Sequence, residues 1–319
     1  MQAVFLDYQS LDQNDLDFSA LSQAFSHLEL FATTTPEQIL ERIGHVDVVI
    51  TNKVKLDADI LQQCPQLKLI LISATGTNNV DLAQARAQGI VVCNCQGYGT
   101  AAVAQHTLML MLNLATSFLN YDRAVRAGKW QKANQFCLLD FPISELSGKT
   151  LGIVGFGELG QAVAKLAEAF GMQIQVAQLP HRPKQQGRLP LNDVLEQADF
   201  LTLHCPLTEE TRDLIGEAEL ARMKKSAFLI NCARGGIVNE AALKAALING
   251  TIAGAATDVL TVEPPVAGNL LLDDSIPNLI ITPHSAWGSV DARQRIVTQM
   301  LENFRAFEQG QPIRQVNSN

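Results

Sequence analysis

The sequence predicts an α/β protein of two domains, at least one of which holds a doubly wound parallel sheet. Three observations support this prediction. The chain has 319 residues, which corresponds to about two domains of ordinary size and leaves ample length for buried cores. Apolar residues make up 47% of the chain and charged residues only 18%, so much of it must be interior. Short β-rich apolar runs alternate with helical stretches along nearly the whole length, as in β-α-β units.

The first hundred residues predict a small α/β domain. Its apolar runs lack strict alternation of polar and apolar residues, which is typical of parallel strands buried on both faces. These strands are expected at residues 3–6, 28–31, 46–51, 67–73 and 90–92.

A second series of strands begins after a break at Gly97, Tyr98 and Gly99. Helical periodicity over residues 101–119 precedes a polar, aromatic connector. Strands are then expected at residues 150–154, 173–177, 200–203, 227–231, 252–257 and 278–282, with helices between most of them, for example at 159–170 and 240–248. This order predicts a doubly wound sheet. Residues 289–308 predict one amphipathic C-terminal helix, followed by a polar tail.

Composition disfavours several classes of partner. The formal net charge is −8 and no block of Lys and Arg occurs, so we expect no nucleic-acid partner. Residues 87–121 contain no charged side chain. Polar residues such as Asn94 and His106 interrupt this run, whereas a membrane span needs about 20 predominantly apolar residues. We therefore expect a buried segment and no membrane association. The N-terminus lacks a basic segment and reaches an acid at Asp7, which argues against a signal peptide.

The six cysteines form no Cys-x-x-Cys pair and no Cys/His ligand spacing. They are typical of reduced thiols, so we expect a cytoplasmic protein without a metal site.

A glycine motif predicts a dinucleotide site. Gly155, Gly157 and Gly160 form G-x-G-x-x-G directly after an expected strand and at the start of an expected helix, with Glu158 and Leu159 between them. In this motif the first glycine makes the tight turn, the second lets the backbone approach a pyrophosphate, and the third lets helix and strand pack closely. Such a turn can also serve packing alone, but the surrounding strands and helix favour dinucleotide binding.

The residues after the second strand of this series favour NADP over NAD. An NAD site usually has an acid here that accepts a hydrogen bond from the ribose 2′-hydroxyl. The strand ends instead in Gln178, and no Asp or Glu occurs between Glu168 and Asp193, while Arg182 follows closely. The site thus lacks the carboxylate that would repel a 2′-phosphate. The alternative is a solvated basic loop in which Gln178 binds the ribose of either cofactor.

Several motifs resemble those of the D-isomer-specific 2-hydroxyacid dehydrogenase family in order and spacing. They lie at residues 231–240, 254–259, 263–264 and 282–287. Residues 74–81 and 97–106 resemble its glycerate dehydrogenase/hydroxypyruvate reductase branch. The resemblance covers nearly the whole chain and implies reduction of a small 2-keto acid by NAD(P)H, with hydroxypyruvate or glyoxylate giving D-glycerate or glycolate.

The resemblance implies that Arg234, Glu263 and His284 are catalytic. The chemistry of these residue types agrees. An arginine holds a carboxylate with a fixed fork of donors, and a histidine exchanges protons near neutral pH. Glu263 would orient the imidazole and favour its protonated form. From the residues alone, Arg234 could be a surface arginine, Glu263 a solvated loop acid and His284 an ordinary loop histidine. His106, inside the uncharged helix, is interpreted as structural.

Other positions follow from the same resemblance. Thr75 and Gly76 would receive the substrate carboxylate, together with Arg234 and His284, and Asp258 would bind the nicotinamide carboxamide. The residues implied to line the cofactor further are His204, Cys205, Pro206, Cys232 and Ala233. The alternative for residues 204–206 is a strand-end turn. Two departures from the family pattern are Gln105 in place of Glu and Asn239 in place of Asp, and Asn239 would still cap a helix.

The resemblance also implies a domain arrangement. Residues 1–98 and 288–319 would form a flavodoxin-like substrate domain, and residues 99–287 an inserted Rossmann dinucleotide-binding domain. A homodimer would cover the uncharged segment. Alternatives are a dinucleotide-sensing, corepressor-like binding protein on the same fold, and a phosphonate or formate dehydrogenase.

Overall fold

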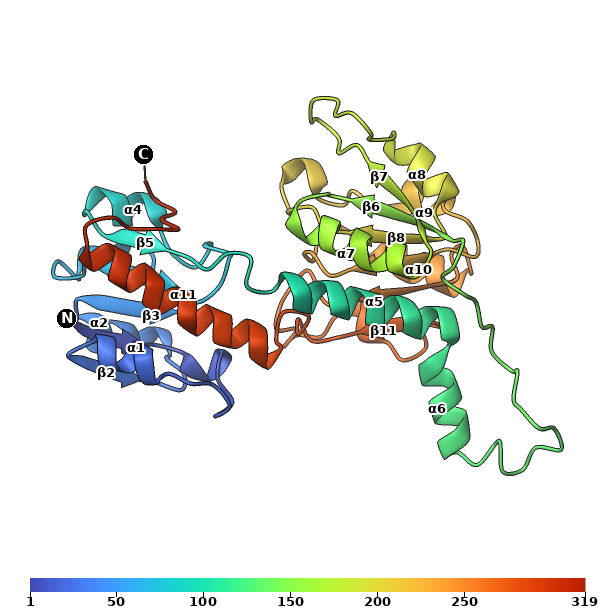
Figure 1. The fold of residues 1–319 in the computed structure, drawn as a ribbon, viewed down its shortest axis with the longest axis horizontal. Coiled ribbons are helices and arrows are strands. Elements are labelled where there is room, and N and C mark those ends of the chain that lie inside the picture. Colours follow the sequence, from blue (N-terminus) through green and yellow to red (C-terminus); the bar gives the residue numbers. More distant parts are fainter. Residues whose placement is uncertain (319) are drawn as a thin grey trace. The chain divides into compact units, whose positions relative to one another are not determined.

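The computed structural model describes residues 1–318, which divide into two compact units. The terminal unit comprises Met1–Gly99 and the C-terminal segment from Gly288, and the inserted unit comprises Thr100–Trp287. The sequence predicted that the units change after residues 98 and 287. In the structure they change after Gly99, one residue later, and after Trp287, as predicted. The prediction of an α/β fold with parallel sheets is confirmed in both units (Figure 1).

Among the described residues, the terminal unit holds a five-stranded parallel sheet in the order β2-β1-β3-β4-β5. This is the flavodoxin-like strand order. The strands are β1 (Gln2–Phe5), β2 (His27–Leu30), β3 (Val48–Thr51), β4 (Leu69–Ile72) and β5 (Val91–Cys93). Each lies within two residues of an expected strand. The central strands β3 and β4 are buried along their whole length, as their uninterrupted apolar sequence predicts.

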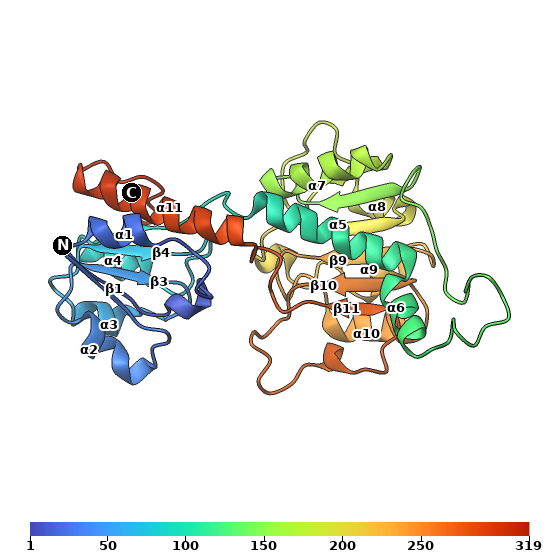
Figure 2. The ribbon, with the colours of Figure 1, turned by 60° about the horizontal axis from the view of Figure 1, so that its bottom comes forward.

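Helices cover both faces of this sheet (Figure 2). One side carries α1 (Ser19–Ala24) and the long C-terminal α11 (Val290–Glu308), and the other carries α2 (Ile39–Ile43) and α3 (Ala58–Gln62). The helix α4 (Leu82–Ala87) also contributes to the core, and short 3-10 turns lie at Tyr8–Ser10 and Pro36–Gln38. The rings of Phe25 and Phe304 are 4.2 Å apart, which joins α11 to the N-terminal segment.

The C-terminal helix begins where the sequence predicts. Ser289 caps it, because its hydroxyl accepts a hydrogen bond from the Ala292 N–H at 3.1 Å. Beyond α11 the tail runs back along β5, where the Val316 N–H donates to the Val92 carbonyl at 2.9 Å. These contacts explain why the last residues belong to the terminal unit.

The inserted unit holds a second parallel sheet, in the order β11-β10-β9-β8-β6-β7 over the described residues. Its strands are β6 (Thr150–Val154), β7 (Gln173–Ala177), β8 (Phe200–Leu203), β9 (Phe228–Asn231), β10 (Gly254–Thr257) and β11 (Leu279–Ile281). A parallel bridge joins Leu189 to Ala177 at the outer edge. With that bridge taken as a minimal third strand, the order becomes that of the Rossmann fold.

Two hydrophobic clusters sandwich the second sheet. One face packs against α5 (Thr100–Thr116) and α7 (Glu158–Ala169), which lie side by side (Figure 1). The other packs against α8 (Leu191–Gln197), α9 (Glu217–Arg222) and α10 (Glu240–Ile248). Short 3-10 turns lie at Glu209–Thr211 and Leu270–Leu272. As predicted, Asn239 caps α10, with its side chain accepting from the Ala242 N–H at 2.9 Å.

The prediction of one helix over residues 101–119 is wrong at its end. The helix α5 stops at Thr116, Ser117 adopts a left-handed φ of 51°, and α6 (Phe118–Arg126) leaves in a new direction. The Ser117 hydroxyl donates to the Pro142 carbonyl at 2.7 Å, which holds the turn. No single helix in residues 1–318 is long and apolar enough to cross a membrane, and α5 and α6 pass that test only when taken together across a 62° bend.

Candidate active site

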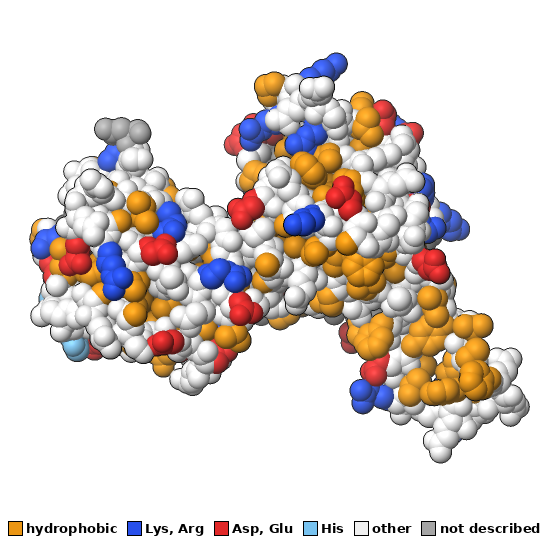
Figure 3. All heavy atoms as spheres, viewed as in Figure 1, with side chains coloured by type: hydrophobic (Ala, Val, Ile, Leu, Met, Phe, Trp, Pro, Cys, Tyr) orange, Lys and Arg blue, Asp and Glu red, His pale blue; other side chains and the backbone are white. Residues whose placement is uncertain are grey.

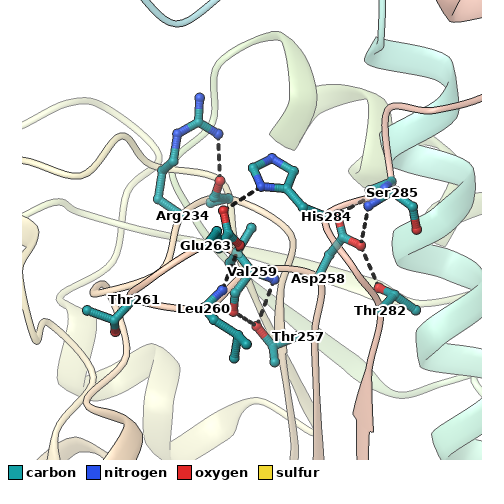
Figure 4. Close-up of polar contacts among 12 residues, drawn as sticks. Arg234, Thr257, Asp258, Val259, Leu260, Thr261, Glu263, Thr282, His284 and Ser285 are labelled. Carbon is teal, nitrogen blue, oxygen red and sulfur yellow. Dashed lines mark hydrogen bonds and ion pairs between the residues drawn. The ribbon is translucent and has the colours of Figure 1, made fainter. Parts of the chain in front are cut away.

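The residues predicted to be catalytic follow the carboxyl ends of three neighbouring strands in the inserted unit. Arg234 comes three residues after β9, Glu263 lies in the loop after β10, and His284 comes three residues after β11. Because the strands are parallel, their ends meet at one edge of the sheet, where such folds bind ligands. The three residues, which span 50 positions in sequence, therefore come together (Figure 4).

The turn that carries Arg234 is held by a buried asparagine. Asn231 accepts from the Ala233 N–H at 3.1 Å and donates to the Arg234 carbonyl at 2.9 Å. The Arg234 guanidinium in turn donates to the Ala233 carbonyl at 2.7 Å. Gly235 follows directly, and a Cβ at that position would overlap the carbonyl of Leu260. The absence of a side chain lets the β9 turn lie against the loop that carries Glu263.

Glu263 and His284 form a direct pair (Figure 4). The Oε2 of Glu263 lies 2.7 Å from Nδ1 of His284, and its Oε1 accepts from the Leu260 N–H at 2.8 Å. A carboxylate only accepts, so Nδ1 of the imidazole carries the hydrogen. In the neutral ring the lone pair then lies on Nε2, which is the nitrogen left to exchange a proton. The two side chains are 34% and 32% exposed, so they are accessible to a small substrate.

The backbone at His284 is held in an uncommon conformation. Its φ is 52°, in the left-handed region. Its N–H lies 2.8 Å from the Asp258 carbonyl, and the flanking residues bind the Asp258 carboxylate. Asp258 itself is buried. These contacts organise the loop that carries His284, and the contact of the Asp258 carboxylate with a nicotinamide stays a prediction.

The glycine turn has the geometry of a dinucleotide cradle. Gly155 has a φ of 92°, and a Cβ there would lie 2.5 Å from the Cys205 N atom. A Cβ on Gly160 would overlap the Gly155 carbonyl, so helix and strand need that glycine to pack. A Cβ on Gly157 would meet no atom of residues 1–318 within 4 Å apart from its two chain neighbours. Packing therefore does not require a glycine at 157, whereas close approach of a pyrophosphate would. The start of α7 adds backbone N–H groups and a positive dipole end.

Comparison with known proteins decides the family. Residues 108–286 match the model of the D-isomer specific 2-hydroxyacid dehydrogenase, NAD binding domain. A glycerate dehydrogenase of Methylorubrum extorquens is 46% identical over 98% of this chain and 97% of its own. A hydroxypyruvate reductase of Blautia hydrogenotrophica is 34% identical over 99% of this chain and 100% of its own. The crystal structure of the TT0316 protein from Thermus thermophilus superposes with a TM-score of 0.86 at 34% identity, covering 99% of this chain and 100% of the other.

The chain belongs to the D-isomer specific 2-hydroxyacid dehydrogenases. It is therefore a dehydrogenase that uses a nicotinamide dinucleotide, and the resemblance to the glycerate dehydrogenase/hydroxypyruvate reductase branch is confirmed. The geometry of the glycine turn, which leaves space for a pyrophosphate at Gly157, agrees with this assignment.

Three strand-end residues of this dehydrogenase are uncharged; Cys205 and Cys232 are buried and His204 is half-buried. Burial lowers the pKa of His204 to about 4, so its imidazole is neutral at physiological pH. Its Nε2 lies 2.9 Å from the Thr202 hydroxyl, and its buried Nδ1 has no hydrogen-bond partner among residues 1–318. Burial also raises the pKa of Cys205 to about 11 and that of Cys232 to about 12. These thiols are protonated at neutral pH, which excludes them as nucleophiles there.

The side chain of Gln178 is occupied by its own loop. Its amide donates to the carbonyls of Leu179, Arg182 and Pro183, and its oxygen accepts from the Gln185 N–H at 3.1 Å. Gln178 thus shapes the loop in which the exposed Arg182 lies. The contact of either residue with a ribose or its phosphate stays a prediction.

The remaining predicted site residues fall in two places. Pro206, Ala233, Glu158 and Leu159 lie in the inserted unit beside the strand ends or at the start of α7. Thr75 and Gly76 lie in the terminal unit, in the loop after β4, where the Thr75 hydroxyl donates to the Cys95 carbonyl at 2.9 Å. Their contact with substrate stays a prediction. Within residues 1–318 no cluster of His, Cys, Asp and Glu could hold a metal ion, and all six cysteines are free.

Sequence reasoning missed three residues that support the site. Asn231 holds the turn that carries Arg234. Thr282 donates to the Asp258 carboxylate, and His106 contacts the Thr282 hydroxyl. A signal for Asn231 and Thr282 was present, because each is a polar residue at the end of an apolar strand. No local signal connects His106 to Thr282, which lies 176 positions away.

Proposed function

We propose that this dehydrogenase reduces hydroxypyruvate or glyoxylate to D-glycerate or glycolate with NAD(P)H. The observation that carries the proposal is the Glu263–His284 pair, with Nδ1 and Oε2 2.7 Å apart, beside Arg234 at three adjacent strand ends. An acid–base histidine next to a carboxylate-binding arginine suits a 2-keto acid. The named glycerate dehydrogenase and hydroxypyruvate reductase relatives support the substrate class.

Each residue would have a separate task in the reduction. The bound nicotinamide supplies a hydride for C2 of the keto acid. Arg234 would hold the carboxylate and draw electron density toward the keto oxygen. His284, protonated on both nitrogens, would give its Nε2 proton to that oxygen and become neutral, and Glu263 would stabilise the imidazolium beforehand. In the oxidation of the hydroxy acid, the same Nε2 would accept the proton.

The proposal is tested by turnover of purified protein. NADPH and NADH oxidation would be followed with hydroxypyruvate, glyoxylate, pyruvate and 2-ketoisocaproate, and NAD(P)⁺ reduction with formate and with phosphite. We expect the highest kcat/KM for hydroxypyruvate or glyoxylate. No turnover of any keto acid by protein that binds the dinucleotide would overturn the proposal, and activity with formate or phosphite alone would replace it.

We further propose NADP as the preferred cofactor. Support comes from the loop that follows β7, where Arg182 and Lys184 are exposed and no carboxylate lies between Glu168 and Asp193. Glu210 lies close enough that the charges of His181 and Arg182 contribute to lowering its pKa, after the larger effect of the Thr208 hydroxyl. A 2′-phosphate would therefore compete with this carboxylate for Arg182.

We also propose that the protein is a homodimer. Exposed apolar side chains gather on α6 and the following segment of the inserted unit (Figure 3), among them Phe118, Trp130, Phe136, Leu139 and Ile143. Phe136 is 95% exposed. A groove of about 750 Å³ lies between the end of α5, the start of α6 and the edge strand β11. A large exposed apolar patch is typical of a subunit interface.

The dimer is tested by multi-angle light scattering. We expect twice the chain mass for the natural sequence and the chain mass for the double variant Phe136→Asp with Leu139→Asp. A monomer for the natural sequence would contradict the dimer.

We propose a cytoplasmic location as well. Its support is the six free thiols in residues 1–318. Cell fractionation that recovers the protein outside the cytoplasm would contradict it.

A further inference from the structure

A buried polar network lies behind the catalytic loop. Asp258 is 1% exposed, and its Oδ1 accepts from the Thr282 hydroxyl at 2.5 Å and from the Ser285 N–H at 2.9 Å. Its Oδ2 accepts from the Ala286 N–H at 2.9 Å. Thr282 and Ser285 lie on either side of His284, so one carboxylate fixes the chain before and after the catalytic imidazole (Figure 4).

The helix α5 adds a histidine to this network. The Nε2 of His106 lies 3.0 Å from the Thr282 hydroxyl oxygen and 3.6 Å from Oδ1 of Asp258. The single hydrogen of the Thr282 hydroxyl goes to Asp258, so that oxygen can only accept from His106. The geometry therefore requires a hydrogen on Nε2 of His106. If the ring carried its hydrogen only on Nδ1, the lone pair of Nε2 would face a lone pair of the Thr282 hydroxyl oxygen.

The surroundings keep His106 uncharged. Its side chain is 15% exposed, and burial lowers its pKa, an effect that the negative charge of Asp258 partly opposes. The helix α5 carries no charged residue, and the thiol of Cys232 on the neighbouring strand end is protonated. On α7, which packs against α5, the side chains of Glu158, Lys165 and Glu168 are exposed. The link from His106 to Thr282 is thus a neutral hydrogen bond at physiological pH.

We propose that His106 is a positioning residue for His284. Its Nε2–H directs the Thr282 hydroxyl onto Asp258, and Asp258 then holds both flanks of His284 at a left-handed φ of 52°. A non-glycine residue keeps such a conformation only when its surroundings over-determine it. Without the His106 contact, the Thr282 hydroxyl is free to turn and the loop that presents the imidazole loosens. This inference rests on the role proposed above for His284.

Two variants separate positioning from bulk packing. His106→Leu keeps an apolar side chain of similar reach but removes the donor, whereas His106→Gln can place an N–H near the position of Nε2. We expect His106→Leu to lower kcat about tenfold, because small misplacements of catalytic groups are costly. The KM for the keto acid should change less than threefold, and His106→Gln should recover most of the loss. Gln105→Leu, at the exposed neighbouring position, should leave kcat unchanged.

Thr282→Val tests the same link from its other end and replaces His106→Leu should that variant fail to fold. It should lower kcat to the same extent, and the double variant should be no worse than either single one, because both remove one link. Three results would overturn the proposal. The first is a kcat for His106→Leu or Thr282→Val that stays within twofold of the natural protein. The others are a loss in His106→Gln as large as that in His106→Leu, and additive losses in the double variant.

Nitrogen-15 spectra of the histidine side chains give a readout that needs no turnover. At pH 7 we expect His106 to be the neutral ring with its hydrogen on Nε2, and Thr282→Val to shift its Nε2 resonance. The other neutral tautomer would overturn the positioning role even in an active enzyme. If no keto acid is turned over but the expected tautomer is found, the proposed function fails while the network stands.

Discussion

His284 depends on its neighbours for its position and for the placement of a hydrogen on Nδ1. Its Nδ1 lies 2.7 Å from Glu263, and its backbone is fastened to the Asp258 carbonyl at 2.8 Å. Glu263 uses both carboxylate oxygens, one for the imidazole and one for the Leu260 N–H. An amide in its place can accept at one oxygen only, and its NH₂ would face a donor.

The substitution Glu263→Gln should therefore lower kcat by about 10²-fold, and His284→Ala by about 10²- to 10⁴-fold, the range typical of a lost general acid. Steady-state kinetics with a saturating keto acid measures both effects. Glu240→Gln is a matched control, because Glu240 accepts from the Thr261 N–H at 2.8 Å in the same loop without contacting His284. Equal losses in Glu263→Gln and Glu240→Gln would show that loop geometry, and not the imidazole contact, explains the effect.

The proposed preference for NADP can be tested at a single side chain, Arg182. Arg182→Ala should lower the ratio of kcat/KM for NADPH to that for NADH by about ten- to a hundredfold, since a charge-assisted contact to phosphate contributes roughly 1.5–3 kcal/mol. Arg222→Ala, another exposed arginine of the inserted unit, should leave the ratio unchanged. An unchanged ratio in Arg182→Ala would remove the case for NADP based on this residue.

The sequence predicted Arg234, Glu263 and His284 because each follows a recognisable strand in a motif that resembles a known family. It did not reveal the role of His106. That role depends on one hydroxyl hydrogen and on a contact between α5 and the β11 loop, and no periodicity or spacing encodes either. His106 was interpreted as a structural residue. Its side chain is only 15% exposed, but its contact with Thr282 also carries the positioning role proposed above.

At the scale of elements, the glycine turn contains two residues that packing requires and one that packing does not require. Gly155 and Gly160 have no room for a side chain, whereas a Cβ on Gly157 would meet no atom of the described chain within 4 Å apart from its two chain neighbours. The three glycines of one motif are therefore required for different reasons.

Gly157→Ala should leave the melting temperature unchanged and weaken dinucleotide binding at least about tenfold, because the added methyl would occupy the approach of the pyrophosphate. Gly155→Ala should instead lower the free energy of unfolding by more than about 2 kcal/mol, since φ is 92° and a Cβ would meet backbone. Thermal unfolding and a fluorescence titration with NADPH distinguish the two. Normal NADPH affinity in Gly157→Ala would contradict the predicted role of this turn.

All the expected strands, and three of the four helices for which the sequence predicted a range, lie within two residues of the observed elements. The strands could be predicted because buried parallel strands have uninterrupted apolar sequences. Two features could not be predicted. The break at Ser117 involves neither glycine nor proline, and it is stabilised by a hydrogen bond to Pro142 that periodicity cannot reveal. The third strand of the Rossmann order is reduced to a single bridge at Leu189, too short for any sequence pattern.

At the scale of the whole molecule, the uncharged segment from residue 87 to 121 now has a structural explanation. It contains β5, the connection between the units, and α5, whose inner face packs against α7 and the second sheet. The prediction that this segment is buried is wrong at its end, because residues 118–121 begin α6, where Phe118 is 57% exposed. The sequence could not show which faces the chain itself covers, so the dimer stays a proposal.

Acid sensitivity is expected from His204. Its pKa falls from the usual 6.5 to about 4 through burial, so between these values the unfolded chain binds a proton that the folded chain does not. Acidification in this window therefore favours unfolding, by up to an amount on the order of 3 kcal/mol once the pH is below 4.

The variant His204→Gln should reduce the loss of melting temperature between pH 7 and pH 4.5, whatever its effect at pH 7. His181→Gln, at an exposed position, should keep the full loss. An identical pH dependence in His204→Gln and the natural protein would show that His204 is not the responsible group.

Transfer of labelled hydride tests the central claim most directly. The protein would be incubated with hydroxypyruvate or glyoxylate and NADPH carrying deuterium at C4 of the nicotinamide, with each C4 position labelled in turn. We predict deuterium at C2 of D-glycerate or glycolate from one of the two labels, and a rate of label transfer about 10²- to 10⁴-fold lower with His284→Ala. Tight dinucleotide binding without deuterium in either product would contradict the account and favour a dinucleotide-sensing protein.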